Sequence, residues 1–232
     1  MSVPPKSAVA AFFDREADTW DGAHGPESGR AGEFAARAAY LRALCGMLGK
    51  PTVIDLGCGT GRQLIDLADQ IEAGVGLDLS PEMVARAEAN AARLGADAKI
   101  VFRTGDTASA RPEQLGRFGL ALFVGSLEHA PDQAALLAAA AGLLEPQGRL
   151  VVIMPHPRNP GVLLACRGGA VPQGVPLRHL TPRALAALGR TVGLRMETVS
   201  GLPYRASGAV LAAAVRRWPL VAGAYAARFA LA

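Results

Sequence analysis

The stretch that decides the fold is Val53–Gln63, with the sequence VIDLGCGTGRQ. A short apolar run leads into glycines at positions 57, 59 and 61, and a helical pattern follows. Glycines let a backbone approach a ligand closely and adopt conformations that a Cβ forbids. In an open α/β sheet, ligands bind outside the carboxyl ends of the strands. The stretch therefore predicts a strand, a ligand-binding turn and the start of a helix.

Apolar runs and helical patterns alternate from about residue 50 onward. The first five expected strands are continuous apolar runs, which is typical of strands buried on both faces of a parallel sheet. Alternation of this regularity predicts a doubly wound α/β sandwich with right-handed crossovers. The expected strands are residues 52–57, 74–80, 99–106, 119–125, 149–155, 194–202 and 225–232.

Capping residues followed by proline mark two expected helix starts, Ser80-Pro81 and Thr181-Pro182. A third helix is expected from Pro131 to Leu144, where the sequence Glu-Pro-Gln-Gly ends it. Residues 1–50 lack the alternation and combine an aromatic segment, a Gly/Pro/Ser-rich loop and an expected helix over 33–48. We therefore predict an N-terminal helical cap over residues 1–50 and a sheet domain over residues 51–232.

Composition narrows the class of protein. Half of the 232 residues are apolar and 19% are charged, so a sizeable core is expected. The net charge is +4, with scattered arginines that do not form the basic stripe typical of nucleic-acid binding. Cys45, Cys58 and Cys166 have no C-x-x-C spacing, which argues against a disulfide framework or a zinc site.

Neither end of the chain suggests targeting or a membrane span. The first residues contain no apolar run like that of a signal peptide, and the apolar C-terminal region is interrupted by Arg216, Arg217, Pro219 and Arg228. We expect a cytoplasmic protein that has no transmembrane segment, no resident metal and no nucleic-acid partner.

Three kinds of nucleotide site use a glycine turn after a strand. A P-loop requires a lysine followed by Ser or Thr, and neither occurs here. A dinucleotide site prefers a third glycine at position 62, where this chain has Arg62. The third kind carries an acid two residues before the first glycine. The pattern Asp55-Leu-Gly57-Cys-Gly59-Thr-Gly61 resembles the D-x-G-x-G-x-G motif of class I S-adenosylmethionine (SAM) methyltransferases.

Further segments resemble other motifs of that family. Residues 76–83, GLDLSPEM, are similar to the second motif, whose acid (here Asp78) holds the ribose hydroxyls. Residues 104–107, TGDT, are similar to the third, whose acid (here Asp106) bonds the adenine amino group. Residues 123–129, FVGSLEH, resemble the fourth. The resemblance runs from about residue 50 to the C-terminus and implies strand order 3-2-1-4-5-7-6 with the last strand antiparallel. Gly119 departs from the family, which usually has an acid there.

The resemblance implies SAM as the cofactor. Carbonyls near Gly57 and the carboxylate of Asp55 suit the ammonium of SAM, and the turn N–H groups suit its carboxylate. Structural roles stay open for Asp55 as a turn cap, for Asp78 as a strand-end acid and for Asp106 as a turn residue. The expected cofactor-binding residues are Asp55, Gly57, Cys58, Gly59, Gly61, Asp78, Leu79, Asp106, Thr107, Val124 and Gly125.

The acceptor is expected to be a small organic molecule. The chain lacks the Asn/Asp-Pro-Pro-aromatic tetrad that DNA and protein amide methylases of this fold carry after strand four. Phe13-Asp14-x-x-Ala17-x-x-Trp20-Asp21 resembles the cap of the ubiquinone- and menaquinone-biosynthesis methyltransferases. The resemblance implies O- or C-methylation of a quinone precursor, a polyketide or a terpenoid-like compound. The alternatives are an NAD(P)-dependent oxidoreductase and a non-catalytic SAM-fold binding protein.

A base is needed only if the acceptor arrives protonated. His156, between two prolines in the loop after the fifth strand, and His129 of the fourth motif are the candidate catalytic residues. Trp20, His24 and Tyr204 are the candidates for the substrate pocket. For each of them a purely structural role stays open. An apolar helix with Arg216-Arg217 is compatible with transient contact with a membrane surface, and a monomer or a homodimer is expected.

Overall fold

The computed structural model describes residues 6–24, 31–167, 175–202 and 223–232. In chain order the elements are α1 (Lys6–His24), α2 (Ala31–Met47), β1 (Val53–Leu56), α3 (Arg62–Asp66), β2 (Gly74–Asp78), α4 (Pro81–Leu94), β3 (Ile100–Thr104), the 3₁₀ turn η1 (Thr107–Ser109), α5 (Pro112–Leu115), β4 (Phe118–Val124), the 3₁₀ turn η2 (Leu127–His129), α6 (Gln133–Gly142), β5 (Leu144–Pro155), α7 (Pro160–Arg167), α8 (Pro182–Thr191), β6 (Leu194–Leu202) and β7 (Ala224–Leu231).

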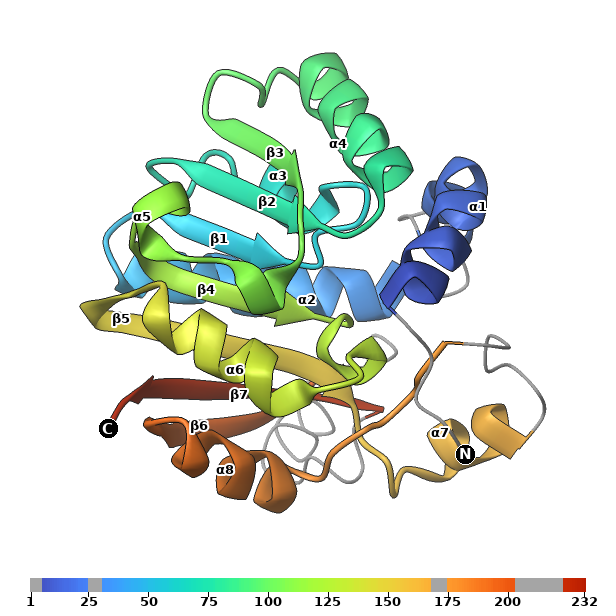
Figure 1. The fold of residues 1–232 in the computed structure, drawn as a ribbon, viewed down its shortest axis with the longest axis vertical. Coiled ribbons are helices and arrows are strands. Elements are labelled where there is room, and N and C mark those ends of the chain that lie inside the picture. Colours follow the sequence, from blue (N-terminus) through green and yellow to red (C-terminus); the bar gives the residue numbers. More distant parts are fainter. Residues whose placement is uncertain (1–5, 25–30, 168–174, 203–222) are drawn as a thin grey trace.

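In the described residues the strands form one seven-stranded sheet in the order β3-β2-β1-β4-β5-β7-β6 (Figure 1). The pairs among β1 to β5 are parallel, and β7 runs antiparallel to both β5 and β6. The predicted fold class and the strand order implied by the resemblance are therefore confirmed. Because antiparallel strands need no crossover helix between them, β7 can follow β6 in the chain, pair directly with it and lie between β6 and β5.

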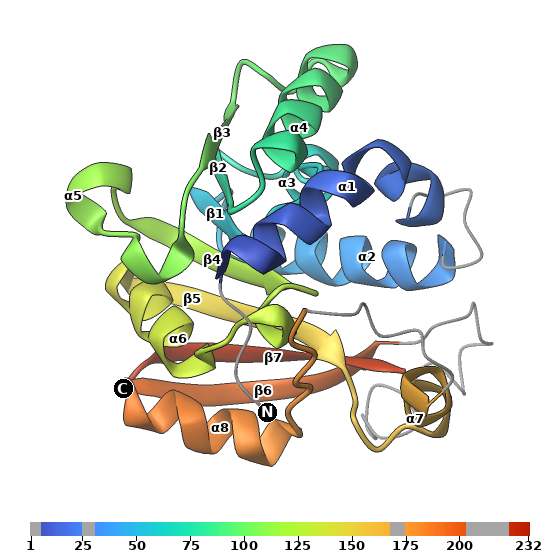
Figure 2. The ribbon, with the colours of Figure 1, turned by 45° about the vertical axis from the view of Figure 1, so that its right-hand side comes forward.

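Alternate residues of the central strands face two separate hydrophobic cores. In β4, Leu120 and Leu122 join one core while Ala121 and Phe123 join the other. Helices α2, α3 and α4 pack on the first face, and α6 and α8 pack on the second (Figure 2). The continuous apolar runs of the sequence follow from this burial, since strands covered on both faces have no solvent side.

The helix starts follow the expected caps, with one correction. Ser80 Oγ accepts the N–H of Met83, and Thr181 Oγ1 accepts the N–H of Ala184. The third helix was expected to run from Pro131 to Leu144, but α6 spans Gln133–Gly142 and is capped by Asp132. Leu144 instead opens β5, because it pairs with Phe118 beyond a register shift in the β4–β5 ladder.

The helix α1 lies at the edge of the sheet where β1 and β4 end (Figure 1). Side-chain hydrogen bonds hold α1 against the neighbouring segments. Asp21 accepts hydrogen bonds from Thr60 Oγ1 at 2.6 Å and from Asn90 Nδ2 at 2.8 Å, and Asp14 accepts one from Ser80. Helix α1 therefore covers the glycine turn.

In the described part of the chain, no helix is long and apolar enough to cross a bilayer.

Candidate active site

The glycine turn after β1 is packed too closely for side chains. Gly57 has φ +78°, and a Cβ there would lie 2.5 Å from the Cβ of Ser126. Ser126 is itself held by a 2.6 Å hydrogen bond from its Oγ to the carbonyl of Leu56. At Gly61, also at φ +78°, a Cβ would lie 2.6 Å from the Phe102 ring. Both positions therefore require glycine, the first for the loop after β4 and the second for core packing.

Asp78, at the end of β2, ties the turn to the sheet. Its Oδ2 accepts the N–H of Gly59 at 2.8 Å and its Oδ1 accepts the N–H of Ser80 at 3.0 Å. Each carboxylate oxygen has two lone pairs, so both oxygens can accept another donor. Burial raises the pKa of Asp78, and the backbone hydrogen bonds from Ser80 and Gly59 oppose the rise. Asp78 thus has a structural bond at each oxygen and room for a ligand hydroxyl.

Asp55, within β1, has no hydrogen-bond partner. It is 1% exposed, and neither carboxylate oxygen is bonded in the described structure. Burial raises the pKa of Asp55 well above its ordinary value, and the nearby Asp78 raises it further. A buried, unpaired carboxylate is costly, so its retention points to a cationic group that binds beside it. This residue fits the ammonium of an amino-acid ligand.

A cavity of about 480 Å³ opens above these residues, within the size range of small-molecule sites. Among the described residues, its lining carries six carboxylates and two arginines, so it favours a cationic ligand although the chain is basic. Of the predicted site residues, those lining it are Trp20, Asp55, Gly57, Cys58, Gly59, Asp78, Leu79, Asp106, Thr107, Val124, Gly125 and His129.

Asp106 combines two features. Its side chain caps η1 by accepting the N–H of Ala108 at 3.0 Å and the hydroxyl of Ser109 at 3.3 Å. It also lines the cavity together with its neighbour Thr107. The turn role considered from the sequence is therefore present, and it does not exclude contact with a ligand.

Arg37 on α2 is a cavity residue that sequence reasoning missed. It is 5% exposed, forms a buried ion pair with Glu33, and lies with its guanidinium 5.5 Å from the Phe34 ring centroid. Its Nε has no partner in the described structure. A single buried cation on the wall of an acidic cavity suits the carboxylate of a ligand. The sequence feature that could have indicated this residue is an arginine within the Ala-rich stretch of residues 35–39.

Another part of the cavity wall, referred to below as the aromatic end, is built from rings. Phe13 packs edge-to-face on Trp20 with ring centroids 5.6 Å apart, and on His129 at 5.4 Å. Phe12 and Phe34 also line the cavity. Such walls suit a flat apolar molecule. Trp20 also reaches the turn, since a Cβ on Gly59 would lie 3.9 Å from its Nε1.

The two candidate catalytic histidines differ in position. His129 lines the cavity, and its Nδ1 lies 3.0 Å from the carbonyl oxygen of Pro176. His156 does not line it, which corrects the expectation for this residue. It is 6% exposed, its ring packs against Tyr225 at 5.8 Å, and its Nδ1 accepts the N–H of Arg158. Prolines stand on both sides of His156, as the sequence indicated, but its ring packs against Tyr225 of β7 and does not line the cavity.

Two further polar residues of the aromatic end were not predicted as site residues. Glu128 is 4% exposed and its Oε2 has no partner in the described structure. His179, in the segment before α8, lines the cavity with Glu128. In the sequence, Glu128 was indicated only by the motif that contains it, and no local pattern indicated His179. The two residues come together only through tertiary packing.

Of the remaining predicted residues, one does not line the cavity and two lie outside the description. Gly61 packs against Phe102 behind the turn. Tyr204 and the side chain of His24 lie outside what the structure describes. Within the described ranges, no group of three His, Cys, Asp or Glu side chains could hold a metal ion.

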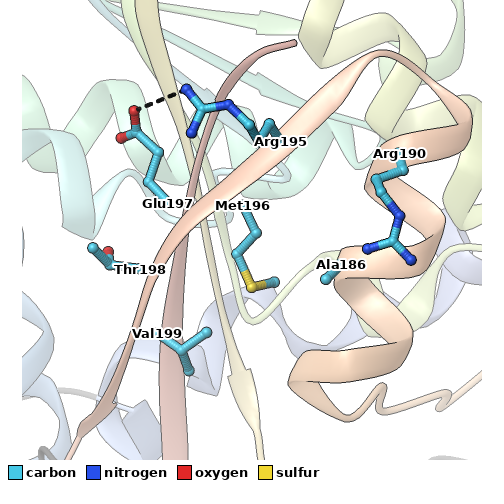
Figure 3. Close-up of a pocket in the computed structure, with 7 residues that line it drawn as sticks. All are labelled: Ala186, Arg190, Arg195, Met196, Glu197, Thr198 and Val199. Carbon is cyan, nitrogen blue, oxygen red and sulfur yellow. Dashed lines mark ion pairs between the residues drawn. The ribbon is translucent and has the colours of Figure 1, made fainter.

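A second, smaller hollow of about 340 Å³ lies between α8 and β6 (Figure 3). Its carboxylate, Glu197, is already engaged by arginines: its Oε2 accepts hydrogen bonds from Arg149 and Arg228, and Arg195 lies 3.9 Å from its Oε1. None of the predicted site residues lies there. The larger cavity is therefore the candidate active site.

Comparisons with known proteins agree with this geometry. Residues 49–165 match the family described as "Methyltransferase domain". The ubiquinone biosynthesis O-methyltransferase of Xanthomonas axonopodis pv. citri is 31% identical over 205 residues, which cover 83% of this chain and 82% of that protein. A similar protein from Xanthomonas campestris pv. campestris is 30% identical over 224 residues, 88% of this chain and 90% of its own.

Solved structures share the fold at low identity. The magnesium protoporphyrin IX methyltransferase of Synechocystis, crystallised with S-adenosylhomocysteine (SAH), has a TM-score of 0.75 at 19% identity, covering 98% of this chain and all of its own. The [4+2]-cyclase SpnF has a TM-score of 0.70 at 21% identity, covering 100% of this chain and 99% of its own, so the fold alone does not define the reaction. The match over half of the chain and the curated relatives do define the family: this chain belongs to the methyltransferase-domain family and is a methyltransferase.

Proposed function

We propose that this methyltransferase uses SAM to methylate a hydroxyl oxygen of a small aromatic acceptor, such as a quinone precursor. When bound, SAM supplies a methyl group activated by a positively charged sulfonium. The observation that carries the proposal is the buried, unpartnered carboxylate of Asp55 in an acidic cavity whose other end is aromatic. The Xanthomonas relatives support the acceptor class through their names, and the SAH-bound Synechocystis neighbour supports the cofactor.

The described residues suggest how each part of the cofactor is held. Asp55 takes the ammonium and Arg37 the carboxylate, because each is a buried charge on the cavity wall with at least one polar atom that has no partner in the described structure. Asp78 accepts from the ribose hydroxyls through its spare lone pairs. Asp106, Thr107 and Leu79 line the part of the cavity that remains for adenine.

The acceptor end aligns the second substrate and excludes water. Phe12, Phe13 and Trp20 of α1 provide apolar walls, so we propose that residues 1–50 act as a cap over the acceptor. Holding the acceptor oxygen in line supplies much of the rate enhancement, since proximity replaces a bimolecular encounter. The groups able to take a hydroxyl proton at this end are His129, His179 and Glu128.

The predicted membrane contact falls within residues 203–222, outside the described residues, and stays a prediction. The monomeric or homodimeric state also stays a prediction.

Calorimetric titration with SAM, SAH and NAD tests the cofactor. SAM and SAH should bind and NAD should not, and Asp78→Ala should weaken SAM by about 100-fold or more, because a hydrogen-bonded charge near two hydroxyls is lost. Binding of NAD alone would contradict the proposal. Incubation with SAM and a panel of alkylcatechols then tests the acceptor. Mass spectrometry should detect a methyl ether, whereas a product methylated on carbon or nitrogen would refute O-methylation.

A further inference from the structure

The imidazole of His179 lies at the aromatic end of the cavity. His179 lines the cavity beside Glu128 and His129. Among the described residues, no hydrogen bond reaches either of its ring nitrogens, and Glu128 Oε2 is also buried without a partner. The buried, unpartnered Oε2 of Glu128 is the costly group of this wall, and a positive charge formed on the neighbouring imidazole would relieve that cost.

The backbone on both sides of His179 is fixed. The N–H of Arg178 donates to the carbonyl of Glu128 at 2.8 Å, and the carbonyl of Arg178 accepts from Gln133 Nε2 at 2.8 Å. The carbonyl of Leu180 accepts from the hydroxyl of Tyr225 at 2.7 Å. The ring is therefore presented to the cavity from a rigid segment, as a group that must meet a reacting atom requires.

His129 forms a hydrogen bond with the same segment. A carbonyl only accepts, so the Nδ1 that faces Pro176 carries the proton and donates to it. The ring edge also packs on Phe13. His129 thus uses its Nδ1 and its ring to join η2 to the segment before α8 and to α1, which is a positioning role, whereas His179 has no such bond among the described residues.

We propose that His179 is the general base that takes the hydroxyl proton of the acceptor, and that Glu128 stabilises the imidazolium formed. This inference rests on the proposed O-methylation. The hydroxyl oxygen forms the bond to the methyl carbon as the carbon–sulfur bond breaks with both electrons left on sulfur. The hydroxyl proton passes to a ring nitrogen of His179 and leaves to solvent, to which this half-buried side chain has access.

The electrostatics of the wall agree with this role. Burial lowers the pKa of His179, Glu128 raises it, and His129 lowers it, with a net lowering. Those two residues of η2 are the charged and titratable groups that act on the ring, and Arg37 lies beside Glu128 near Gly125. The imidazole is therefore neutral near neutral pH and able to accept a proton.

The test compares histidine variants with the alkylcatechol that the wild type methylates fastest. His179→Gln should lower kcat near neutral pH by about 100-fold or more, with the KM for the catechol and the Kd of SAM changed by less than about threefold. The loss should shrink as the pH rises toward ionisation of the catechol, because a catecholate needs no base. A His179→Gln enzyme with activity within a few-fold of wild type at neutral pH would overturn the proposal.

Two other variants identify which histidine acts. His129→Asn keeps a donor for the Pro176 carbonyl while removing Nε2, and should cost less than about tenfold in kcat. A loss as large as that of His179→Gln would overturn the proposal in favour of His129. His156→Asn, outside the cavity and able to accept the Arg158 N–H, should leave kcat unchanged.

A binding measurement separates this inference from the proposed function. Absence of any methylated catechol from the wild type would refute O-methylation. His179 is then still judged by NMR on protein saturated with SAH, in which His179→Gln assigns the ring resonances. Addition of the catechol should shift the His179 ring signals, and unchanged signals would overturn its placement at the acceptor.

Discussion

The two ends of the cavity are built by different means. The cofactor end is made by backbone: Gly57 closely approaches the loop after β4, and strand pairing aligns β1 with β2. The acceptor end is made by side chains on segments distant in sequence, namely α1, η2 and the residues before α8. Strand pairing together with the hydrogen bonds of Asp78 and Ser126 holds the first end, whereas hydrogen bonds and ring contacts between distant segments hold the second. The cofactor end should therefore tolerate substitution less well than the acceptor end.

The largest effect is expected from Gly57→Ala, compared with Gly95→Ala. Both glycines have positive φ, but a Cβ at Gly57 meets Ser126 while a Cβ at Gly95 meets nothing within 4 Å. Gly95→Ala should cost about 1–2 kcal/mol of unfolding free energy through backbone strain alone. Gly57→Ala should cost roughly 2–5 kcal/mol because overpacking adds to that strain, and it should also weaken SAM binding.

Urea denaturation of the two glycine variants measures this difference, provided that the m-values agree. Calorimetry adds the affinity for SAM, which Gly95→Ala should leave unchanged. Equal losses of stability in the two variants would mean that the close approach of the β4 loop to the turn does not constrain position 57.

A smaller effect, of opposite sign for stability and binding, is expected from Asp55→Asn. Burial raises the folded-state pKa of Asp55 above its ordinary 3.8, so the folded protein holds this proton more tightly than the unfolded chain does. The contribution of Asp55 to stability therefore falls as the pH rises from about 3.8 through the raised pKa. Without ligand, Asp55→Asn should be more stable than wild type at neutral pH and should lack this pH dependence.

SAM binding should show the cost of removing the charge. Loss of a charge-assisted hydrogen bond to the ammonium corresponds to about a 10- to 100-fold rise in Kd. Denaturation across the acidic to neutral pH range gives the stability curve, and calorimetry gives the Kd. An Asp55→Asn protein that is less stable at neutral pH, or that binds SAM as tightly as wild type, contradicts the assignment of Asp55 to the ammonium.

The same difference between the two ends explains what the sequence could predict. Asp55, Gly57 and Asp78 belong to contiguous strand–turn patterns, so a linear motif was enough to predict a cofactor site, and the family match confirms the predicted methyltransferase. Arg37, Glu128 and His179 come from three segments that meet only in the folded chain, so no local pattern could pair them.

Two predicted positions show a further limit. Gly61 belongs to the motif yet serves core packing, because the Phe102 ring occupies the space beside it. The prolines around His156 indicated a restrained ring, but the direction of that ring is set by Tyr225 on β7, more than sixty positions along the chain. A pattern can thus predict that a residue is constrained without indicating which neighbour constrains it.

The smallest effects concern the attachment of α1. Asp21→Asn should cost about 0.5–1.5 kcal/mol, because two charged oxygens accept from Thr60 and Asn90, whereas the new amide is neutral and has a single acceptor oxygen. Asp18→Asn should cost below about 1 kcal/mol and less in high salt, since Asp18 is 88% exposed and its partner Arg86 39%. Hydrogen–deuterium exchange should be faster in α1 for Asp21→Asn, nearly unchanged for Asp18→Asn, and unaltered at the glycine turn in both. Equal opening of α1 by both variants would show that surface charge, and not the part-buried hydrogen bonds to Thr60 and Asn90, holds this helix in place. Faster exchange at the turn itself would show that the two ends are coupled and that the stability of the glycine turn depends on α1.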